Sequence, residues 1–296
     1  MSRYVVLDAP SILGLKPTGV ELLPNALNAA GLHAGLDAGY AGRIEPPPYD
    51  AKRDPETLLL NPNGLRAYAL QLADAVSVVL REGKVPVVLG GDCSNLIGCA
   101  LALRRAGRYG LFFIDGHADF YQPEAEPNGE VASMDLAIIS GRGPRVLTDI
   151  EGLQPLVLDE DIVAFAYRDA EEQREYGSQD ICATAIHTVT LDQVRTAGLA
   201  ESAEQALRAL RLERLEGLWI HLDADVLDDA IFPAVDYRMP GGLGWDELST
   251  LLRILTESGK VVGINIGIFN PRLDPSGSLA RRFTECLVAG LMPPKS

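Results

Sequence analysis

The sequence has no apolar run of the roughly 18 residues that a membrane-spanning helix needs, and it is short of basic residues. Its 296 residues include 26 Lys and Arg against 41 Asp and Glu, so the formal net charge is −15. Proteins that bind nucleic acids or anionic membrane surfaces concentrate basic residues, so the composition argues against both partners. The first residues lack an apolar segment with a small-residue cleavage site, and we therefore expect a cytoplasmic protein.

The four cysteines are too few and too scattered for a disulfide framework. They include no Cys-x-x-Cys pair, which favours free thiols in a reducing compartment. We expect Cys99, Cys182 and Cys286 to be small buried residues. Cys93 differs because it follows two glycines and an aspartate at the end of a predicted strand.

Hydrophobic residues make up 47% of the chain, which excludes disorder for most of it. Short apolar runs predict strands at 4–10, 85–91, 109–116, 161–169, 183–190, 218–226 and 261–269. Apolar residues at helical spacing predict helices at 64–82, 94–106, 201–215, 245–257 and 276–291. Continuous apolar strands alternating with helices are typical of a parallel sheet that is covered on both faces. We therefore predict a three-layer αβα sandwich with a central, mainly parallel β-sheet, formed by a single domain over 1–296, with an irregular loop at 41–63.

Two predicted strands end in residues that bind metal ions. Asp115, His117 and Asp119 follow one strand at alternate positions, and Asp223 and Asp225 follow another. Alternate side chains of an extended segment share a face, so each set is expected to point one way. Burying several carboxylates is costly unless cations neutralise them. Carboxylates with an imidazole suit Mn²⁺ or Zn²⁺, and two such ions can activate one water between them.

Other polar residues have a simpler interpretation. Asp92, Asp228 and Asp229 are expected to cap helices or to lie in turns. His33 and His187 have no motif around them, and we expect them to be ordinary surface or core residues. For His221, two interpretations remain: it supports the metal ligands from behind, or it packs in the core.

These segments resemble the motifs of the ureohydrolase superfamily, which includes arginases, agmatinases and formimidoylglutamases. Residues 90–94 resemble its GGDHS motif, residues 115–119 its DAHxD motif, and residues 221–228 its SxDxDxxDP motif. Residues 240–243 match its PGGL turn, and residues 264–271 match its strand that ends in Asn-Pro. The motifs occur in the family order and extend over most of the chain.

The resemblance implies an arginase-like fold, a binuclear centre of two divalent metal ions, Mn in first place and Zn as the alternative, and assembly into trimers or hexamers. It also implies hydrolysis of a guanidine-type C–N bond of a small-molecule substrate by a metal-bridging hydroxide. Asp119 would in addition hydrogen-bond this hydroxide. Carried over position by position, the metal ligands are Cys93, Asp115, His117, Asp119, Asp223 and Asp225.

The sequence departs from the family pattern at three positions. Cys93 stands where the family has a histidine ligand; a thiolate favours Zn²⁺ over Mn²⁺, and the alternative is a small buried residue beside an incomplete site. Ala132 stands where arginases have a proton-shuttling histidine, and nearby Glu130 or Ser133 are the candidates to replace it. Ile268 stands where the family has a guanidinium-binding glutamate, and Asn265 replaces an aspartate on the same strand.

The loop that would bind substrate also has its own composition. It contains Tyr121, Glu124 and Asn128, and Asn128 is our candidate for a substrate contact together with Ile268. Glu171 lies in a segment that resembles the family's RDxD sequence. It either receives a substrate amine or is an exposed loop carboxylate.

We therefore predict a metal-dependent hydrolase of a linear amidine or guanidine C–N bond, with a substrate less cationic than arginine. One alternative is an N-hydroxyguanidine hydrolase, because an N-hydroxy leaving group needs less proton assistance, which fits Ala132. Another is a catalytically silent relative with a structural or regulatory role.

Overall fold

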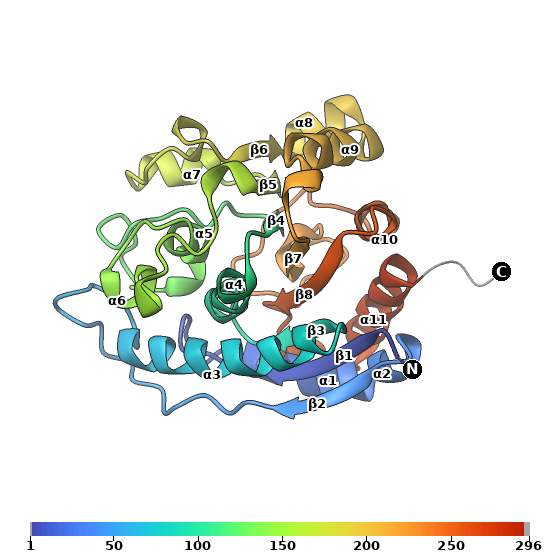
Figure 1. Cartoon of the computed structure of the whole chain (residues 1–296), viewed down its shortest axis with the longest axis horizontal. Coiled ribbons are helices and arrows are strands. Elements are labelled where there is room, and N and C mark those ends of the chain that lie inside the picture. Colours follow the sequence, from blue (N-terminus) through green and yellow to red (C-terminus); the bar gives the residue numbers. More distant parts are fainter. Residues whose placement is uncertain (1, 293–296) are drawn as a thin grey trace.

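The computed structural model, which describes residues 2–292, is organised around one eight-stranded β-sheet (Figure 1). All seven strand pairs are parallel, and the spatial order is β2-β1-β3-β8-β7-β4-β5-β6. The strands are β1 (Tyr4–Ala9), β2 (Gly39–Arg43), β3 (Val85–Gly90), β4 (Gly110–Ile114), β5 (Ile162–Tyr167), β6 (His187–Thr190), β7 (Leu218–Asp223) and β8 (Val261–Gly267).

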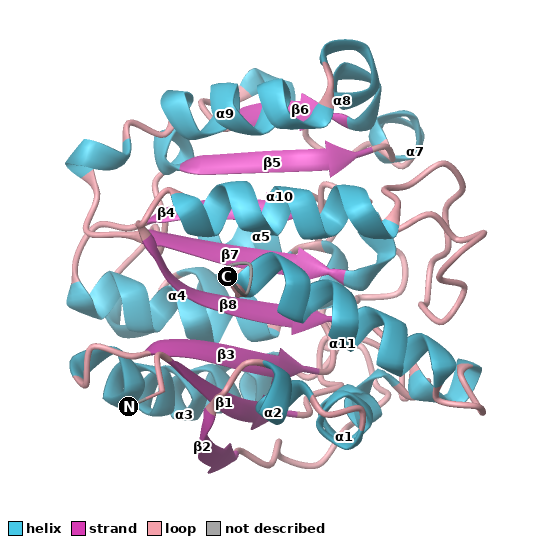
Figure 2. Ribbon diagram, turned by 90° about the vertical axis from the view of Figure 1, so that its right-hand side faces the viewer, coloured by secondary structure: helices cyan, strands magenta, loops and turns pink. Residues whose placement is uncertain are grey.

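Helices cover both faces of this sheet. They are α1 (Leu23–Ala29), α2 (Leu32–Gly35), α3 (Pro62–Arg81), α4 (Asn95–Ala106), α5 (Asp135–Ile139), α6 (Arg145–Thr148), α7 (Ala170–Glu175), α8 (Leu191–Ala197), α9 (Leu199–Ala209), α10 (Trp245–Glu257) and α11 (Ser278–Leu291). Figure 2 shows α1, α2, α9, α10 and α11 in front of the sheet and α3, α4 and α5 behind it. The predicted three-layer αβα arrangement is confirmed. No helix within residues 2–292 has both the length and the apolar character that crossing a bilayer requires.

The two helical layers explain why the strands are continuously apolar. Successive residues of β3 and β4 point to opposite faces: Val87 and Phe112 belong to one apolar cluster, and Val88 and Phe113 to the other. Every residue of β3, β4, β5 and β7 is buried. The central strands therefore have no polar face, and polar side chains collect where these strands end.

The structure differs from the sequence prediction in the smaller and more exposed elements. The predicted loop at 41–63 begins inside β2, an edge strand that pairs only with β1 and has exposed residues. Strand β6 is shorter than predicted, and α9 ends at Ala209, shortly before Arg211, which has a left-handed backbone (φ 49°). The short helices α1, α2 and α5 to α8 were not predicted, because each is too brief to show a helical period.

Candidate active site

The candidate site lies where four neighbouring strands end on one side of the sheet. These strands are β3, β8, β7 and β4; Figure 2 shows the arrowheads of β3, β8 and β7 on the same side, and β4 runs parallel to β7. Parallel strands place their carboxyl ends together, which is where ligands bind in open α/β sheets. Cys93 follows β3, Ile268 follows β8, Asp223 ends β7, and Asp115 follows β4. The sheet order therefore joins motifs that are up to 175 residues apart, from Cys93 to Ile268 (268 − 93).

Two sets of potential ligands meet at these strand ends. Cys93, Asp115 and Asp223 form one set, and Asp115, His117 and Asp225 form the other; within each set the ligand atoms lie within 4.8 Å of one another. The Cys93 thiol donates a hydrogen bond to Asp223 Oδ2 at 2.9 Å, and His117 Nδ1 lies 2.8 Å from Asp225 Oδ2. Because both sets contain Asp115, the arrangement has the form of two adjacent ion sites that share a carboxylate.

The residues after β4 come together by a turn, not by the shared strand face that we predicted. The strand ends at Ile114, and Asp119 has a left-handed backbone with φ 45°. The carboxylate of Asp225 accepts a hydrogen bond from Gly116 N–H at 3.0 Å, and Asp115 accepts one from His117 N–H at 2.6 Å. Backbone donors thus hold the carboxylates in place around the turn.

Burial and mutual repulsion dominate the electrostatics of the cluster. Burial raises the pKa of Asp119 and of Asp223 well above the usual carboxyl range, and neighbouring carboxylates raise both further. Burial also raises the pKa of the Cys93 thiol, with Asp223 adding to the effect. Burial opposes ionisation of Asp115 as well, but the neighbouring imidazoles of His117 and His221, 3.7 and 3.8 Å from its oxygens, hold its pKa down at about 2.

The cluster therefore has the chemistry of a cation site. Without a cation, protons must neutralise most of these carboxylates. The donor set comprises one thiol, one imidazole and four carboxylates, which suits Mn²⁺ at the carboxylate-rich side and Zn²⁺ at the sulfur side. Asp115 Oδ2 has no hydrogen-bond partner within the described part of the chain, although it is buried. Such an atom is costly unless an ion or a donor reaches it.

A cavity of about 140 Å³ leads to this cluster. Five of the six predicted metal ligands line it, together with Ile268, whereas the sixth, Asp115, does not. The lining residues are Leu15, Cys93, His117, Asp119, Tyr121, Glu126, Pro127, Asn128, Glu130, Ala132, Ser133, Glu172, Tyr176, Asp223, Asp225, Tyr237 and Ile268.

The predicted substrate-contacting residues fall into two groups. Asn128, Glu130 and Ile268 line the cavity. Glu171 is exposed and does not line it; the next residue, Glu172, does. The sequence alone did not distinguish the two, because their positions around the first turn of α7 decide which side chain faces the cavity.

Glu130 is a buried carboxylate at the cavity wall with two polar partners. Lys16 Nζ lies 3.1 Å from Glu130 Oε1, and the Tyr237 hydroxyl donates to Glu130 Oε2 at 2.5 Å. The hydrogen bond to Glu130, together with burial, raises the pKa of Tyr237, so the phenol remains protonated and acts as a donor. No sequence signal connected Lys16 or Tyr237 to the site, since both lie far from Glu130 along the chain.

Several minor predictions can be compared with the structure. Asp92 accepts hydrogen bonds from the backbone N–H groups of Gly14 and Ser94, so it joins two loops beside Cys93. Asp228 lies in a turn, as predicted, and accepts from Ala230 N–H at 3.0 Å. Cys182 is exposed, which is contrary to our prediction of a buried residue.

Two buried polar residues near Cys93 were missed or left open by the sequence. Asp135 begins α5 and is fully buried in an otherwise apolar stretch, DLAII. A lone carboxylate in such an apolar stretch is the sequence signal that could have identified Asp135. His221 is also fully buried, and its ring stacks on Phe113 with centroids 4.5 Å apart.

Comparison with known proteins gives the family. A family model described as "Arginase family" matches residues 3–292. The chain belongs to the arginase family. It is 30% identical to an arginase of Bacillus subtilis, covering 98% of this chain and 97% of the relative. It is 29% identical to an arginase of Staphylococcus aureus, covering 94% and 93%. The crystal structure of arginase from Bacillus caldovelox superposes with a TM-score of 0.87 at 27% identity, covering 99% of both chains.

Membership of the arginase family confirms the predicted fold and enzyme class. The chain is a hydrolase of the ureohydrolase type, which acts on non-peptide C–N bonds. The identities stay near 30%, and the cavity differs from the family pattern at Cys93, Ala132 and Ile268. The substrate must therefore be argued from the site of this chain.

Proposed function

We propose that this arginase-family protein is a metal-dependent hydrolase of a linear amidine or guanidine C–N bond whose substrate is not plain arginine. The observation that supports it most directly is the pair of ligand sets that share Asp115 and open into one cavity. Two divalent ions, Mn²⁺ in first place and Zn²⁺ as the alternative, fit this donor set. The ions, when bound, lower the pKa of a water between them toward neutrality.

The residues around the cavity have separate roles in this proposal. Cys93, Asp115, His117, Asp119, Asp223 and Asp225 hold the ions. Asp119 also orients the attacking water through a hydrogen bond. Water adds to the trigonal carbon, the C–N bond breaks, and the leaving nitrogen takes a proton.

Glu130 is the proposed proton carrier for that last step. It lies in the cavity wall, where Lys16 forms an ion pair with it and the Tyr237 hydroxyl donates a hydrogen bond to it. An ionised carboxylate accepts the proton released by the attacking water and returns it to the leaving amine. Ala132 cannot do this, although it lines the same cavity.

The cavity wall also indicates the class of substrate. Ile268 places an apolar side chain where a carboxylate would hold a guanidinium, so the reacting group is expected to be less cationic than that of arginine. Asn128 and Glu172 lie farther along the wall and offer polar contacts for the rest of the substrate. An N-hydroxyguanidine is the second candidate, because its leaving group needs less proton assistance and Ala132 supplies none.

Elemental analysis of the purified protein, with Cys93→His and Cys93→Ala beside it, tests the proposal. About two equivalents of Mn or Zn are expected, retained in the His variant and reduced in the Ala variant. The loaded protein is then assayed with guanidines, N-hydroxyguanidines and amides. One equivalent or none, unchanged by either substitution and by added Mn²⁺, contradicts the binuclear site and favours the catalytically silent alternative. Light scattering on the same samples tests the trimer or hexamer that the resemblance implies.

A further inference from the structure

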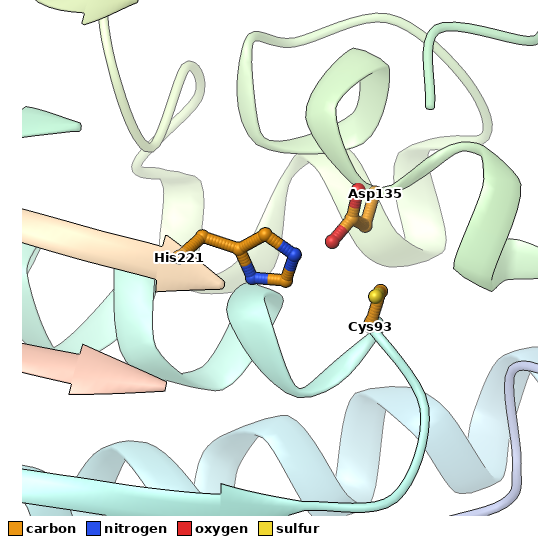
Figure 3. Close-up of side chains that lie close together, drawn as sticks. All are labelled: Cys93, Asp135 and His221. Carbon is orange, nitrogen blue, oxygen red and sulfur yellow. The ribbon is translucent and has the colours of Figure 1, made fainter. Parts of the chain in front are cut away.

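A second group of polar side chains meets Cys93 next to the shared carboxylate Asp115. Cys93, Asp135 and His221 each place one potential ligand atom within 4.8 Å of the others (Figure 3). The three residues come from the loop before α4, the start of α5 and strand β7. The motif patterns quoted above contain neither a carboxylate at 135 nor an imidazole at 221.

This group contains buried polar atoms without hydrogen-bond partners. Within the described residues, both carboxylate oxygens of Asp135, Oδ2 of Asp115 and Nε2 of His221 have none. Asp135 and His221 are 0% exposed and Asp115 is 1% exposed. Each unpaired buried polar group costs roughly 1–3 kcal/mol, and more if it is charged. Four such atoms in one place indicate a site that is completed by a ligand.

The hydrogen-bond network behind His221 decides what its ring can offer. The indole N–H of Trp219 can only donate, and it donates to Asn265 Oδ1 at 2.8 Å. The amide nitrogen of Asn265 must therefore face His221 Nδ1, which lies 2.7 Å away, and donate to it. His221 Nδ1 thus carries the lone pair, and the ring proton is on Nε2. His221 presents an N–H to the group and not a metal-binding lone pair.

The group has fewer hydrogen-bond donors than unpaired acceptor oxygens. His221 Nε2–H lies 3.8 Å from Asp115 Oδ2 and points toward Asp135 (Figure 3). This single donor can satisfy one of three unpaired carboxylate oxygens. Two oxygens remain, next to a thiol that already donates to Asp223. A cation between these residues would satisfy the remaining oxygens and the sulfur together.

We propose that Asp135 is an additional ligand of the metal ion at Cys93, and that His221 is a positioning residue that donates its Nε2–H to the carboxylates of Asp115 and Asp135. This inference rests on the proposed function, since it concerns the same ion site. Asp135 adds a hard oxygen donor next to the soft sulfur of Cys93. It therefore helps this site to retain Mn²⁺, which a thiolate alone disfavours.

Cobalt substitution tests the inference without relying on activity. Co²⁺ is titrated into the metal-free full-length protein, and the thiolate-to-cobalt charge-transfer band reports an ion on Cys93. Cys93→Ser is expected to abolish the band. Asp135→Asn is expected to keep the band but to require more than about tenfold higher Co²⁺, and to lose Mn²⁺ affinity more than Zn²⁺ affinity. His221→Phe, which keeps the stack on Phe113, is expected to weaken binding by the roughly 10–100-fold typical of an outer partner.

Asp229→Asn is the matched control, because it removes the same charge from a partly exposed loop residue that does not line the cavity. It is expected to titrate like the wild type. Thermal unfolding of the metal-free proteins gives a second readout. Asp135→Asn is expected to be at least as stable as the wild type, because it removes an unpaired buried carboxylate, yet to gain less from added Mn²⁺.

Three results would overturn the inference. The first is the absence of a charge-transfer band in the wild type. The second is an Asp135→Asn variant that binds Co²⁺ and Mn²⁺ as the wild type does. The third is an Asp135→Asn variant that is less stable without metal and unchanged in metal affinity, which would show a purely structural role. Failure of the proposed function would give a different result. Asp135→Asn would still weaken metal binding, but the wild type would hydrolyse no guanidine, N-hydroxyguanidine or amide.

Discussion

Ile268 is the residue at which the cavity departs most clearly from a guanidinium site. It follows β8 with φ 69°, a backbone conformation that β-branched residues rarely adopt. Its N–H donates to Gly91 O at 2.9 Å, and this hydrogen bond between two strand ends holds the strained residue in place. The strain fixes the direction of the side chain at the cavity wall, so we expect the chemistry of this side chain to contribute to substrate choice.

Replacing Ile268 with Glu is expected to improve the binding of guanidinium substrates. A carboxylate at this position would form a charge-assisted pair worth about 1.5–3 kcal/mol, so we expect the KM for arginine to fall by about tenfold or more. Ile268→Gln has the same size without the charge and is the control. Steady-state kinetics with arginine and with an uncharged amidine checks this. Equal behaviour of the Glu and Gln variants would show that charge at 268 does not select the substrate.

Gly91 is a glycine because two backbones approach closely there, and not because of a left-handed backbone conformation. Its φ is not positive, but a Cβ atom at this position would lie 1.8 Å from the backbone oxygen of Ser11. The same Ser11 oxygen accepts a hydrogen bond from Asp92 N–H, so the close approach of the two loops sets the position of Cys93.

Gly91→Ala is therefore expected to destabilise the protein by about 3 kcal/mol, because the backbones must separate. Urea unfolding of the metal-free protein measures it. Gly39→Ala in β2 is the control, since its added Cβ would make only an ordinary contact, 3.7 Å from Val5. An equal loss of stability in both variants would contradict the close-approach argument.

At the scale of elements, Arg168 ties the end of β5 to the loop that follows β7. The pairing of β5 with β6 shifts register between Phe165 and Tyr167, directly before Arg168. The guanidinium of Arg168 donates to three backbone carbonyls within 3.1 Å: Asp225 and Met239, each at 3.0 Å, and Pro240 at 3.1 Å. One side chain thus connects the candidate ligand Asp225 to the Pro-Gly-Gly turn.

Arg168→Lys keeps the charge but cannot reach three carbonyls with one ammonium group. We expect a loss of about 2 kcal/mol in unfolding free energy and a weaker Mn²⁺ affinity at the His117 side of the site. Denaturant unfolding and calorimetric Mn²⁺ titration measure the two effects. Arg145→Lys is the control, because Arg145 forms an exposed pair with Asp149 and its change is expected to stay within about 0.5 kcal/mol.

The predictability of each element follows from its burial. The central strands and the long helices α3, α4, α10 and α11 were located from the sequence. Strands that are buried on both faces, and helices that are buried along one stripe, leave a strong apolar pattern in the sequence. The edge strand β2 has only one neighbour and keeps exposed residues, so its five residues show no such pattern. Short helices such as α5 are held by tertiary contacts and not by their own period.

At the scale of the whole molecule, the candidate ligands could be proposed from the sequence because they occur in motifs at strand ends. Their detailed arrangement could not, since it depends on which strands become neighbours. Asp135 lies on a five-residue helix, and only the packing of α5 behind the sheet brings it to Cys93. The direction of the His221 proton likewise depends on Asn265, which is 44 residues away in the chain and adjacent in the sheet.

The same burial of charge predicts an unusual pH dependence for the metal-free protein. Burial raises the folded-state pKa of Asp92 and of Asp169 to about 6, and that of Asp119 and Asp223 further. The folded state therefore binds protons more tightly than the unfolded state, whose carboxyl pKa lies near 4. This stabilisation is complete below about pH 4 and is lost as the pH rises through the folded-state pKa values. The pKa of Asp115 is shifted in the opposite direction, to about 2. Asp115 therefore affects the pH dependence of the unfolding free energy only below about pH 4.

We therefore expect the unfolding free energy of the metal-free protein to fall between about pH 4 and pH 7. Added Mn²⁺ or Zn²⁺ should reverse the slope, because the ions bind deprotonated ligands and stabilise the folded state more as the pH rises. Thermal unfolding with a chelator and with each ion, across this pH range, checks both slopes. Asp92→Asn should flatten the metal-free curve, and Asp229→Asn should leave it unchanged. Parallel curves with chelator and with ion would show that metal ions do not replace protons in this cluster.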